Sequence, residues 1–222
     1  MALNPRVRFI PLCVAILMPI TFTISFMMAR TAGHINGFNY ISDTGTVPAE
    51  SCYFGQLLNI IALLLACTTY HLYQLVDKEN RLERISVWFG ITAGIGASLV
   101  ANFQELNVLL IHIVGALLAF GGGVIYLWLR TFASDFQRKI RWPICVLASV
   151  SLLACAIAGA ISLAKYKHEF GWRILHWTIE DGGYAAHVVS VVAEWLTAIS
   201  LIFYMISHYF EMCVLINADV LP

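Results

Sequence analysis

The stretch AAHVVSVVAEWLTAISLIFYMISHY, residues Ala185–Tyr209, decides the fold of this chain. It is predominantly apolar and contains a single acidic residue, Glu194, and no Lys or Arg. An α-helix rises about 1.5 Å per residue, so roughly 20 apolar residues cross the hydrocarbon core of a bilayer. The stretch therefore predicts a membrane-spanning helix.

Further stretches of the same kind occur along the whole chain. Apolar residues make up 60% of it and charged residues only 12%, about half the charged share of a soluble domain. We expect an all-α membrane protein in which six transmembrane helices form one compact domain over residues 1–222. The expected spans are Ile10–Ala29, Tyr53–Val76, Ser86–Phe103, Val108–Leu129, Pro143–Ala164 and Ala185–Tyr209.

The charged residues predict the orientation and exclude one class of partner. Lys plus Arg and Asp plus Glu both number 13, so no basic surface for nucleic acid is expected. The N-terminal side of the membrane would carry Arg6, Arg8, Lys78, Arg81, Arg84, Arg130, Arg138, Lys139 and Arg141. The opposite side would carry only Arg30, Lys165, Lys167 and Arg173. Basic residues concentrate on the cytosolic side of membrane proteins, which predicts cytosolic termini.

The first loop, HINGFNYISDTGTVPAES over His34–Ser51, is longer than a simple turn between two spans needs to be. Asp43 can bond nearby backbone, and Gly45 can adopt positive φ. Pro48 restricts Val47 to extended conformations. This pattern predicts an ordered luminal loop that acts as a lid.

Polar side chains within spans are costly in lipid and are candidates for function. In the last span, His187, Ser190, Glu194 and Thr197 share one helix face. We predict a polar pocket under the first loop, with Asn59 as the partner of Glu194. Its candidate residues are Asp43, Asn59, Asn102, Glu105, His112, His187, Ser190 and Glu194.

Three interpretations of this pocket remain open. It could be a metal-dependent lipid hydrolase in which Asp43, His112 and His187 hold zinc. It could bind a lipid or small molecule and respond to protons through its histidines. Its side chains could instead only fix the register of the helices. His187 and Glu194 lie about 10 Å apart along the axis, too far to share an ion, so the balance favours a non-enzyme without metal or cofactor.

Two shorter features add expectations. Trp172 and Trp177, in the segment Lys165–Tyr184, predict a short helix at the lipid headgroups. The sequence YFEM at Tyr209–Met212 fits a tyrosine-based sorting motif next to the membrane.

Three blocks of the sequence resemble the DRAM family, the damage-regulated autophagy modulators. They are HINGFNYISDTGTVPAE in the first loop, VANFQELNVLLIHIVGALLAFGGGVIY across the third and fourth spans, and HVVSVVAEW followed by FYMISHYFE in the last span. The resemblance covers all six spans in order. Asn39 stands where relatives are expected to have proline, and the C-terminal tail is short.

The resemblance implies a lysosomal or late endosomal protein that promotes autophagy, with some members acting in stress-induced cell death. The wider superfamily includes proteins of GPI-anchor lipid remodelling and of phosphoinositide kinase recruitment, so the plasma membrane is the alternative location. Membrane lipids and cytosolic or membrane proteins are the expected partners. A lipid-remodelling hydrolase and a scaffold that recruits cytosolic proteins are the alternative functions. The resemblance supplies no catalytic residues.

Overall fold

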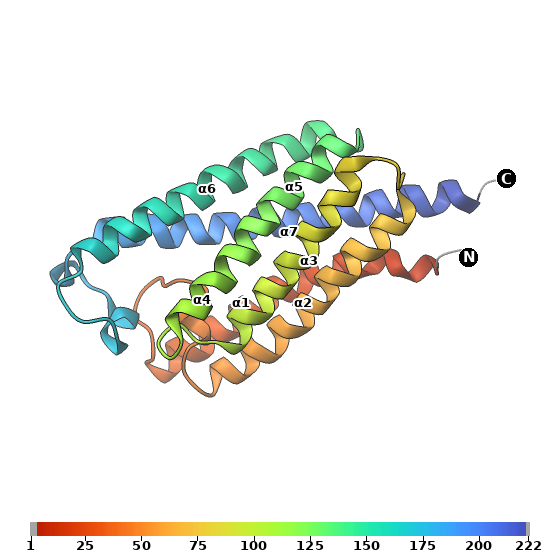
Figure 1. Cartoon of the computed structure of the whole chain (residues 1–222). Helices are drawn as coiled ribbons and strands as arrows, with labels where there is room; N and C mark the ends of the chain where they lie inside the picture. Colours follow the sequence, from red (N-terminus) through yellow and green to blue (C-terminus); the bar gives the residue numbers. More distant parts are fainter. Residues whose placement is uncertain (1–3, 221–222) are drawn as a thin grey trace.

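The computed structural model describes residues 4–220, and over that range the chain is made of helices and their connections. Within these residues, six helices are long and apolar enough to cross a membrane: Pro5–Ala32, Glu50–Leu75, Arg81–Asn102, Leu109–Ala133, Arg138–Lys165 and Tyr184–Ala218. They lie side by side in one elongated bundle (Figure 1). The prediction of an all-α protein with six membrane-spanning helices is confirmed.

The first helices begin and end at residues suited to helix termini. Helix α1, Ile10–Ala32, has Pro11 in its first turn and ends at Gly33, whose φ is 76°; proline suits the first turn and glycine the left-handed cap. Helix α2 covers Glu50–Leu75. Helix α3, Arg81–Asn102, begins after Asn80, whose side chain accepts a 2.9 Å hydrogen bond from the N–H of Leu82.

The fourth span is one helix with a widened turn. Helix α4, Leu109–Ala116, continues through a π-helical turn at Leu117–Gly121 into helix α5, Gly122–Ala133. It crosses α3 closely: a Cβ on Gly96 would lie 2.3 Å from the backbone nitrogen of Ala119. Small residues allow such backbone contact in lipid, where close packing drives helix association.

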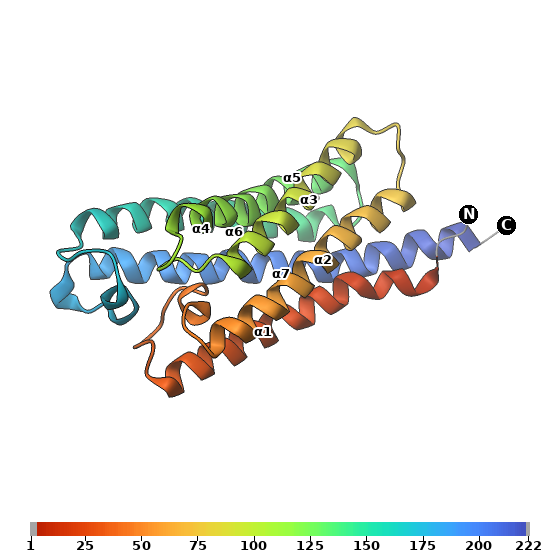
Figure 2. The same ribbon diagram turned by 60° about the horizontal axis from the view of Figure 1, so that its bottom comes forward.

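The last two spans form an antiparallel pair. Helix α6, Arg138–Lys165, packs along helix α7, Tyr184–Val220, while α1 contacts both α2 and α7, and α2 contacts α3 (Figures 1 and 2). Helix α7 continues well beyond Tyr209, where the sequence placed the end of the span. It does so because Met212 and Ile216 are buried against Leu72 of α2.

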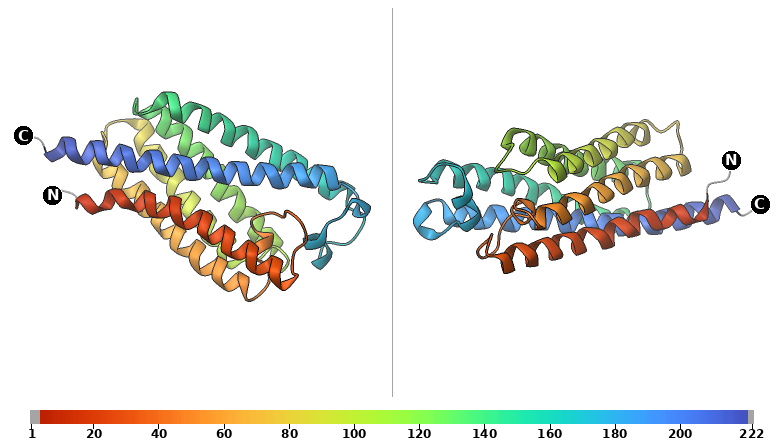
Figure 3. Two further views of the ribbon diagram at one scale, coloured as in Figure 1. Left: turned by 180° about the vertical axis from the view of Figure 1, so that it is seen from behind. Right: turned by 90° about the horizontal axis from the view of Figure 1, so that it is seen from below.

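The two ends of the bundle differ. Both ends of the described chain lie at one end (Figure 3), together with the connections 76–80 and 134–137. We call this the terminal end. The opposite end carries the connections 33–49, 103–108 and 166–183, and we call it the loop face.

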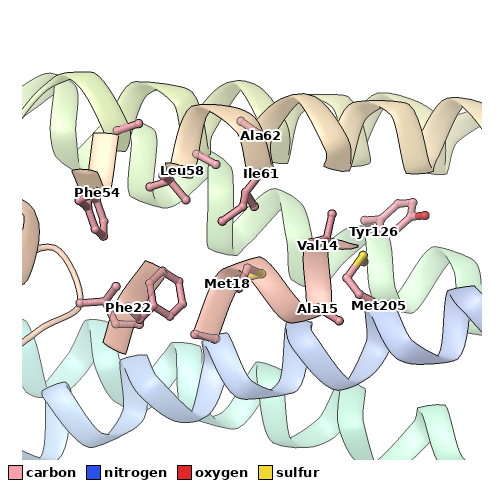
Figure 4. Packing of buried hydrophobic residues seen from close by; sticks show 14 residues of the cluster. Val14, Ala15, Met18, Phe22, Phe54, Leu58, Ile61, Ala62, Tyr126 and Met205 are labelled. Carbon is pink, nitrogen blue, oxygen red and sulfur yellow. The ribbon is translucent and has the colours of Figure 1, made fainter. Parts of the chain in front are cut away.

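A hydrophobic core lies between these ends. Figure 4 shows Phe54, Leu58 and Ile61 of α2 facing side chains of α1 such as Met18 and Phe22. Tyr126 of α5 and Met205 of α7 also belong to this cluster. The core therefore joins most of the bundle and supports the loop face above it.

Candidate functional site

The first loop folds down onto the loop face as a compact cover. The carboxylate of Asp43 accepts hydrogen bonds from the Tyr40 N–H at 3.0 Å and from the Asn39 side-chain amide at 3.2 Å. The Thr44 hydroxyl lies 2.9 Å from that of Ser25 in α1. Gly45 packs so closely on Phe54 that a Cβ would lie 2.4 Å from the ring, so only glycine fits there. The loop is a packed part of the fold. The expectation of positive φ at Gly45 is wrong, since the close contact with Phe54 and not the backbone conformation requires glycine there.

Helix α7 holds this loop in place through two neighbouring side chains. The Glu194 carboxylate accepts a 2.7 Å hydrogen bond from the backbone N–H of Ile41. The Trp195 indole donates a 3.0 Å hydrogen bond to the carbonyl of Asn39. The prediction that Asn59 is the partner of Glu194 is wrong, because the loop reaches deep enough to supply a backbone donor.

Asn59 belongs to a separate polar group that joins α2 to α3. Its side chain exchanges hydrogen bonds with that of Asn102 at 3.2 Å and 3.0 Å, and Ser98 donates to it at 2.7 Å. Amide and hydroxyl groups that satisfy one another across two helices fix the register of the pair. For Asn59 and Asn102, this structure therefore favours the register interpretation.

Asp43 and Glu105 form a carboxyl pair beneath the loop. Ser42 donates a 3.4 Å hydrogen bond to Glu105 Oε2, whereas Oε1 is buried and receives no donor from the described residues. Burial, together with the adjacent charge and hydrogen bonding of Asp43, holds the pKa of the Glu105 carboxyl well above its usual range. The proton that Glu105 retains relieves the repulsion that two neighbouring ionised carboxyl groups would exert on each other.

The two histidines have different surroundings. His112 Nδ1 lies 2.7 Å from the carbonyl of Phe103, and because a carbonyl only accepts, Nδ1 carries the proton. The His187 ring stacks on Trp177 with centroids 4.3 Å apart and contacts Tyr40 edge-on at 5.2 Å. Within residues 4–220, no three His, Cys, Asp or Glu side chains come together closely enough to hold a metal ion. The zinc set of Asp43, His112 and His187 is therefore not assembled.

Ser190 lies at the contact between α7 and α6. Its hydroxyl donates a 2.7 Å hydrogen bond to the carbonyl of Cys155 in α6. This contact joins α7 to α6, so Ser190 serves the packing of that helix pair.

A cavity of about 100 Å³ extends from the loop face into the core. Glu194, His112 and Ser42 line it at the loop face, and most of the remaining wall is apolar, with Phe22, Leu58 and Ile61 among its members. We predicted a polar pocket here, and the composition of the wall corrects that prediction. Most of the polar groups are absent from the wall because they bond to the loop or to one another.

The connection 166–183 packs beside this site instead of lying flat at the headgroups. Trp177 is only 6% exposed and stacks on His187, whereas Trp172 is 61% exposed. Asp181 organises the segment: it accepts hydrogen bonds from the Thr178 hydroxyl at 2.7 Å and N–H at 2.8 Å, and Arg173 contacts it at 2.7 Å. These bonds hold the pKa of Asp181 down at about 2. The expectation of an interfacial helix anchored by both tryptophans is wrong for Trp177.

The sequence also matches a known family over nearly its whole length. The family model described as the Frag1/DRAM/Sfk1/Cwh43P N-terminal domain matches residues 6–213. The chain belongs to the Frag1/DRAM/Sfk1 family. The predicted resemblance is thereby confirmed.

The relatives of this Frag1/DRAM/Sfk1 chain share about a third of its residues. DNA damage-regulated autophagy modulator protein 1 of Mus musculus is 36% identical over 90% of this chain and 88% of its own length. Protein 2 of that name from Rattus norvegicus is 34% identical over 90% and 81%. The modulator of macroautophagy TMEM150B of Bos taurus is 32% identical over 86% and 79%. No solved structure matches the chain.

A second polar group of this Frag1/DRAM/Sfk1 chain lies towards the terminal end, and sequence reasoning missed it. Arg130 of α5 pairs with Glu83 of α3 and, at 2.8 Å, with Glu211 of α7. Arg141 of α6 pairs with the other oxygen of Glu211 at 2.8 Å, and His208 lies 3.3 Å from it. All five side chains are buried. We call Glu83, Arg130, Arg141, His208 and Glu211 the ion network.

The ion network also changes the interpretation of two sequence signals. Arg130 and Arg141 were assigned to the cytosolic surface, but they are internal ions. Glu211 and Met212 of the YFEM sequence are buried within α7, so this segment is not an exposed extended peptide. The missed signal was the presence of two acids, Glu83 and Glu211, close to the end of the bundle at which Arg130 and Arg141 were placed.

Proposed function

We propose that this chain modulates autophagy from the lysosomal or late endosomal membrane, through lipid binding at the loop face and in the cavity below it. The names of its DRAM and TMEM150B relatives support a role in autophagy. The site supports lipid binding, because the cavity joins an apolar interior to polar groups at the membrane surface. Such a combination suits an amphipathic ligand.

The basic residues support a luminal loop face with cytosolic termini. Arg130 and Arg141 are neutralised inside the bundle and do not count as surface charges. Even without them, the terminal end carries more Lys and Arg than the loop face. The positive-inside tendency then places the loop face in the lumen.

One observation carries the proposal: Glu194 belongs both to the cavity wall and to the attachment of the loop. A ligand that engaged this carboxylate would compete with or reinforce its bond to Ile41. Occupancy of the cavity would thereby change how firmly the first loop is held. In this way the loop face could report on the lipid content of the membrane.

The function is tested by measuring autophagic flux in cells that lack the protein. Rescue by wild type is compared with rescue by Glu194→Gln and by Glu180→Gln, which removes an exposed carboxylate at the same end of the bundle. Amounts of each protein in the lysosome are matched. We expect Glu180→Gln to restore flux and Glu194→Gln to restore less than half of it. Full rescue by both variants would show that autophagic flux does not depend on this site.

The location and orientation need a separate test. Asn36 on the first loop and Glu79 at the terminal end are both exposed, so each is replaced by cysteine in a variant whose native cysteines are alanine. In intact lysosomes, an impermeant maleimide should label Cys at position 79 and not at 36. The opposite pattern would invert the proposed orientation.

One observation favours a scaffold as the second candidate function. At the terminal end, Arg138, Lys139 and Trp142 border an open surface hollow, and basic residues near the membrane attract anionic lipids or acidic partner segments. This candidate predicts that Arg138→Gln with Lys139→Gln abolishes rescue of flux while Glu194→Gln has no effect.

A further inference from the structure

The cavity has the length of one lipid chain in one leaflet. Its wall includes Glu194 and Met205 of α7, and Phe54 and Thr69 of α2. At 1.5 Å per residue, these pairs lie about 16 Å and about 22 Å apart along their helices. Half of the hydrocarbon core of a bilayer measures about 15 Å. A cavity of about 100 Å³ over this length is narrow, so it suits a single alkyl chain and not a sterol ring system.

The polar groups at the mouth of the cavity present acceptors. Glu194 Oε2 accepts from Ile41, while Oε1 receives no hydrogen bond from any described residue. His112 uses Nδ1–H for the carbonyl of Phe103, which leaves the lone pair of Nε2 as an acceptor. Ser42 donates its proton to Glu105 and retains lone pairs on its oxygen. The mouth therefore offers three acceptor atoms.

Three carboxyl groups lie at or beside the mouth, and Glu105 among them retains its proton. Asp43, Glu105 and Glu194 interact with one another electrostatically. Among the described residues, none of the three carboxyl groups forms a salt bridge with Lys or Arg, although the acids of the ion network do. A fatty acid or a phosphate would meet repulsion here. A cation with several N–H donors would meet complementary groups.

We propose that the cavity binds a single-chain lipid amine, whose ammonium group is received by Glu194, His112 and Ser42 and whose alkyl chain lies along the apolar wall. An ammonium group has three N–H donors and no acceptor, which matches the three acceptors at the mouth. Hydrogen bonds between ions of opposite charge are roughly twice as strong as neutral ones. This inference rests on the proposed function, in that it names the class of lipid which the cavity takes.

The test compares ligands that differ only in the head group. Hexadecylamine, hexadecanol and palmitic acid are each titrated against the purified full chain in detergent, and bound ligand is counted by native mass spectrometry. We expect the amine to bind about tenfold more tightly than the alcohol, which corresponds to about 1.4 kcal/mol, and the acid to bind least. Equal binding of all three would overturn the assignment of an amine and leave the cavity as a lipid site.

Three variants locate the binding. Glu194→Gln should reduce amine binding to the level of the alcohol, and Glu180→Gln should leave it unchanged. Ala97→Phe, in the wall of the cavity, should abolish binding of the amine and the alcohol alike. An amine preference that survives Glu194→Gln would overturn the assignment.

Failure of this inference is distinguishable from failure of the proposed function. If wild type binds none of the three chains, both the amine and the lipid-binding role are wrong. The flux experiment then still reports independently whether Glu194 matters for autophagy.

Discussion

The backbone N–H of Ile41 donates a 2.7 Å hydrogen bond to the side chain of Glu194, although 153 positions separate the two residues in the chain. Few contacts in the bundle join positions so far apart through a single backbone donor. The bond attaches the first loop to the last helix and closes the loop face. Its strength should therefore decide how often the loop opens.

Removing the acceptor should free the loop. Glu194→Ala leaves the Ile41 N–H without a partner, which costs about 1–3 kcal/mol when the donor is buried. We expect the Ile41 amide to exchange hydrogen with solvent at least about fivefold faster, measured by mass spectrometry on the chain in detergent. Glu194→Gln retains an oxygen acceptor and should show a smaller change. Unchanged exchange in Glu194→Ala would mean that Trp195 and Asp43 hold the loop alone.

Breaking the ion network should destabilise the protein far more than breaking a surface pair. Arg130→Met leaves the carboxylates of Glu83 and Glu211 short of a buried counter-ion, a change that costs about 3–5 kcal/mol in proteins. Arg138→Met removes the 2.8 Å pair with Asp135, whose side chain is 91% exposed, and should cost less than about 1 kcal/mol. Free energies of unfolding in mixed micelles check both values. Equal losses would show that the network is not desolvated.

The segment 166–183 should resist acid down to unusually low pH. Because its hydrogen bonds lower the pKa of Asp181 from 3.8 to about 2, the carboxylate stabilises the folded segment at every pH above the unfolded value. That contribution is lost as pH falls from 3.8 through about 2. Limited proteolysis after brief exposure to acid should therefore cut this segment no faster at pH 5 than at pH 7, and clearly faster near pH 2. Asp181→Asn should be cut readily at every pH.

Glu105 predicts the opposite dependence on pH. Its pKa is raised in the folded protein by burial and by Asp43, with Glu194 adding to the effect. Folding therefore retains a proton that the unfolded chain releases above about pH 4.5, and stability falls as pH rises from that value towards the raised pKa.

We expect the midpoint of thermal unfolding to be higher at pH 5 than at pH 7.5. His112 and His187 also interact electrostatically with Asp43. The variant Glu105→Gln therefore tests whether Glu105 causes the dependence on pH. Glu105→Gln should lose a large part of the dependence on pH. A variant with the full wild-type dependence would contradict the assignment to Glu105.

The close approach of the helices can be tested by replacing two different glycines with alanine. Gly96→Ala places a Cβ 2.3 Å from the backbone of Ala119, whereas a Cβ on Gly121 has no atom within 4 Å. Forced overpacking costs roughly 1–3 kcal/mol, so Gly96→Ala should lower the thermal unfolding midpoint and Gly121→Ala should not. Similar midpoints for the two variants would show that α3 and the fourth span can separate at little cost.

The fold followed from the sequence because lipid restricts what a backbone can do. Each apolar run had to form a helix, so their number and order could be read directly. The ends were less predictable: α7 continues past Tyr209 because Ile216 finds a tertiary contact on α2. Helix length there depends on a neighbour that is distant in sequence.

The site was predicted in part. Glu105, His112, His187 and Glu194 were selected as costly polar groups, and Asp43 as a turn residue of the loop above them. The structure places all five at the loop face. The apolar wall of the cavity was missed, since its residues do not differ in type from ordinary core or lipid-facing residues. The ion network was missed because Arg130 and Arg141 also fit the pattern of basic residues on the cytosolic side of a membrane. Their acidic partners are distant in sequence and come close only in the folded structure.

The ion network has a consequence for how this sequence can change over time. Its two arginines and two glutamates compensate one another within the bundle, so replacing any one of them leaves an unbalanced charge in a medium that cannot solvate it. Substitutions at these four positions should therefore occur together. In lineages where Arg130 has become neutral, an acid at position 83 or 211 should have been lost with it, and the four positions should coevolve as one unit.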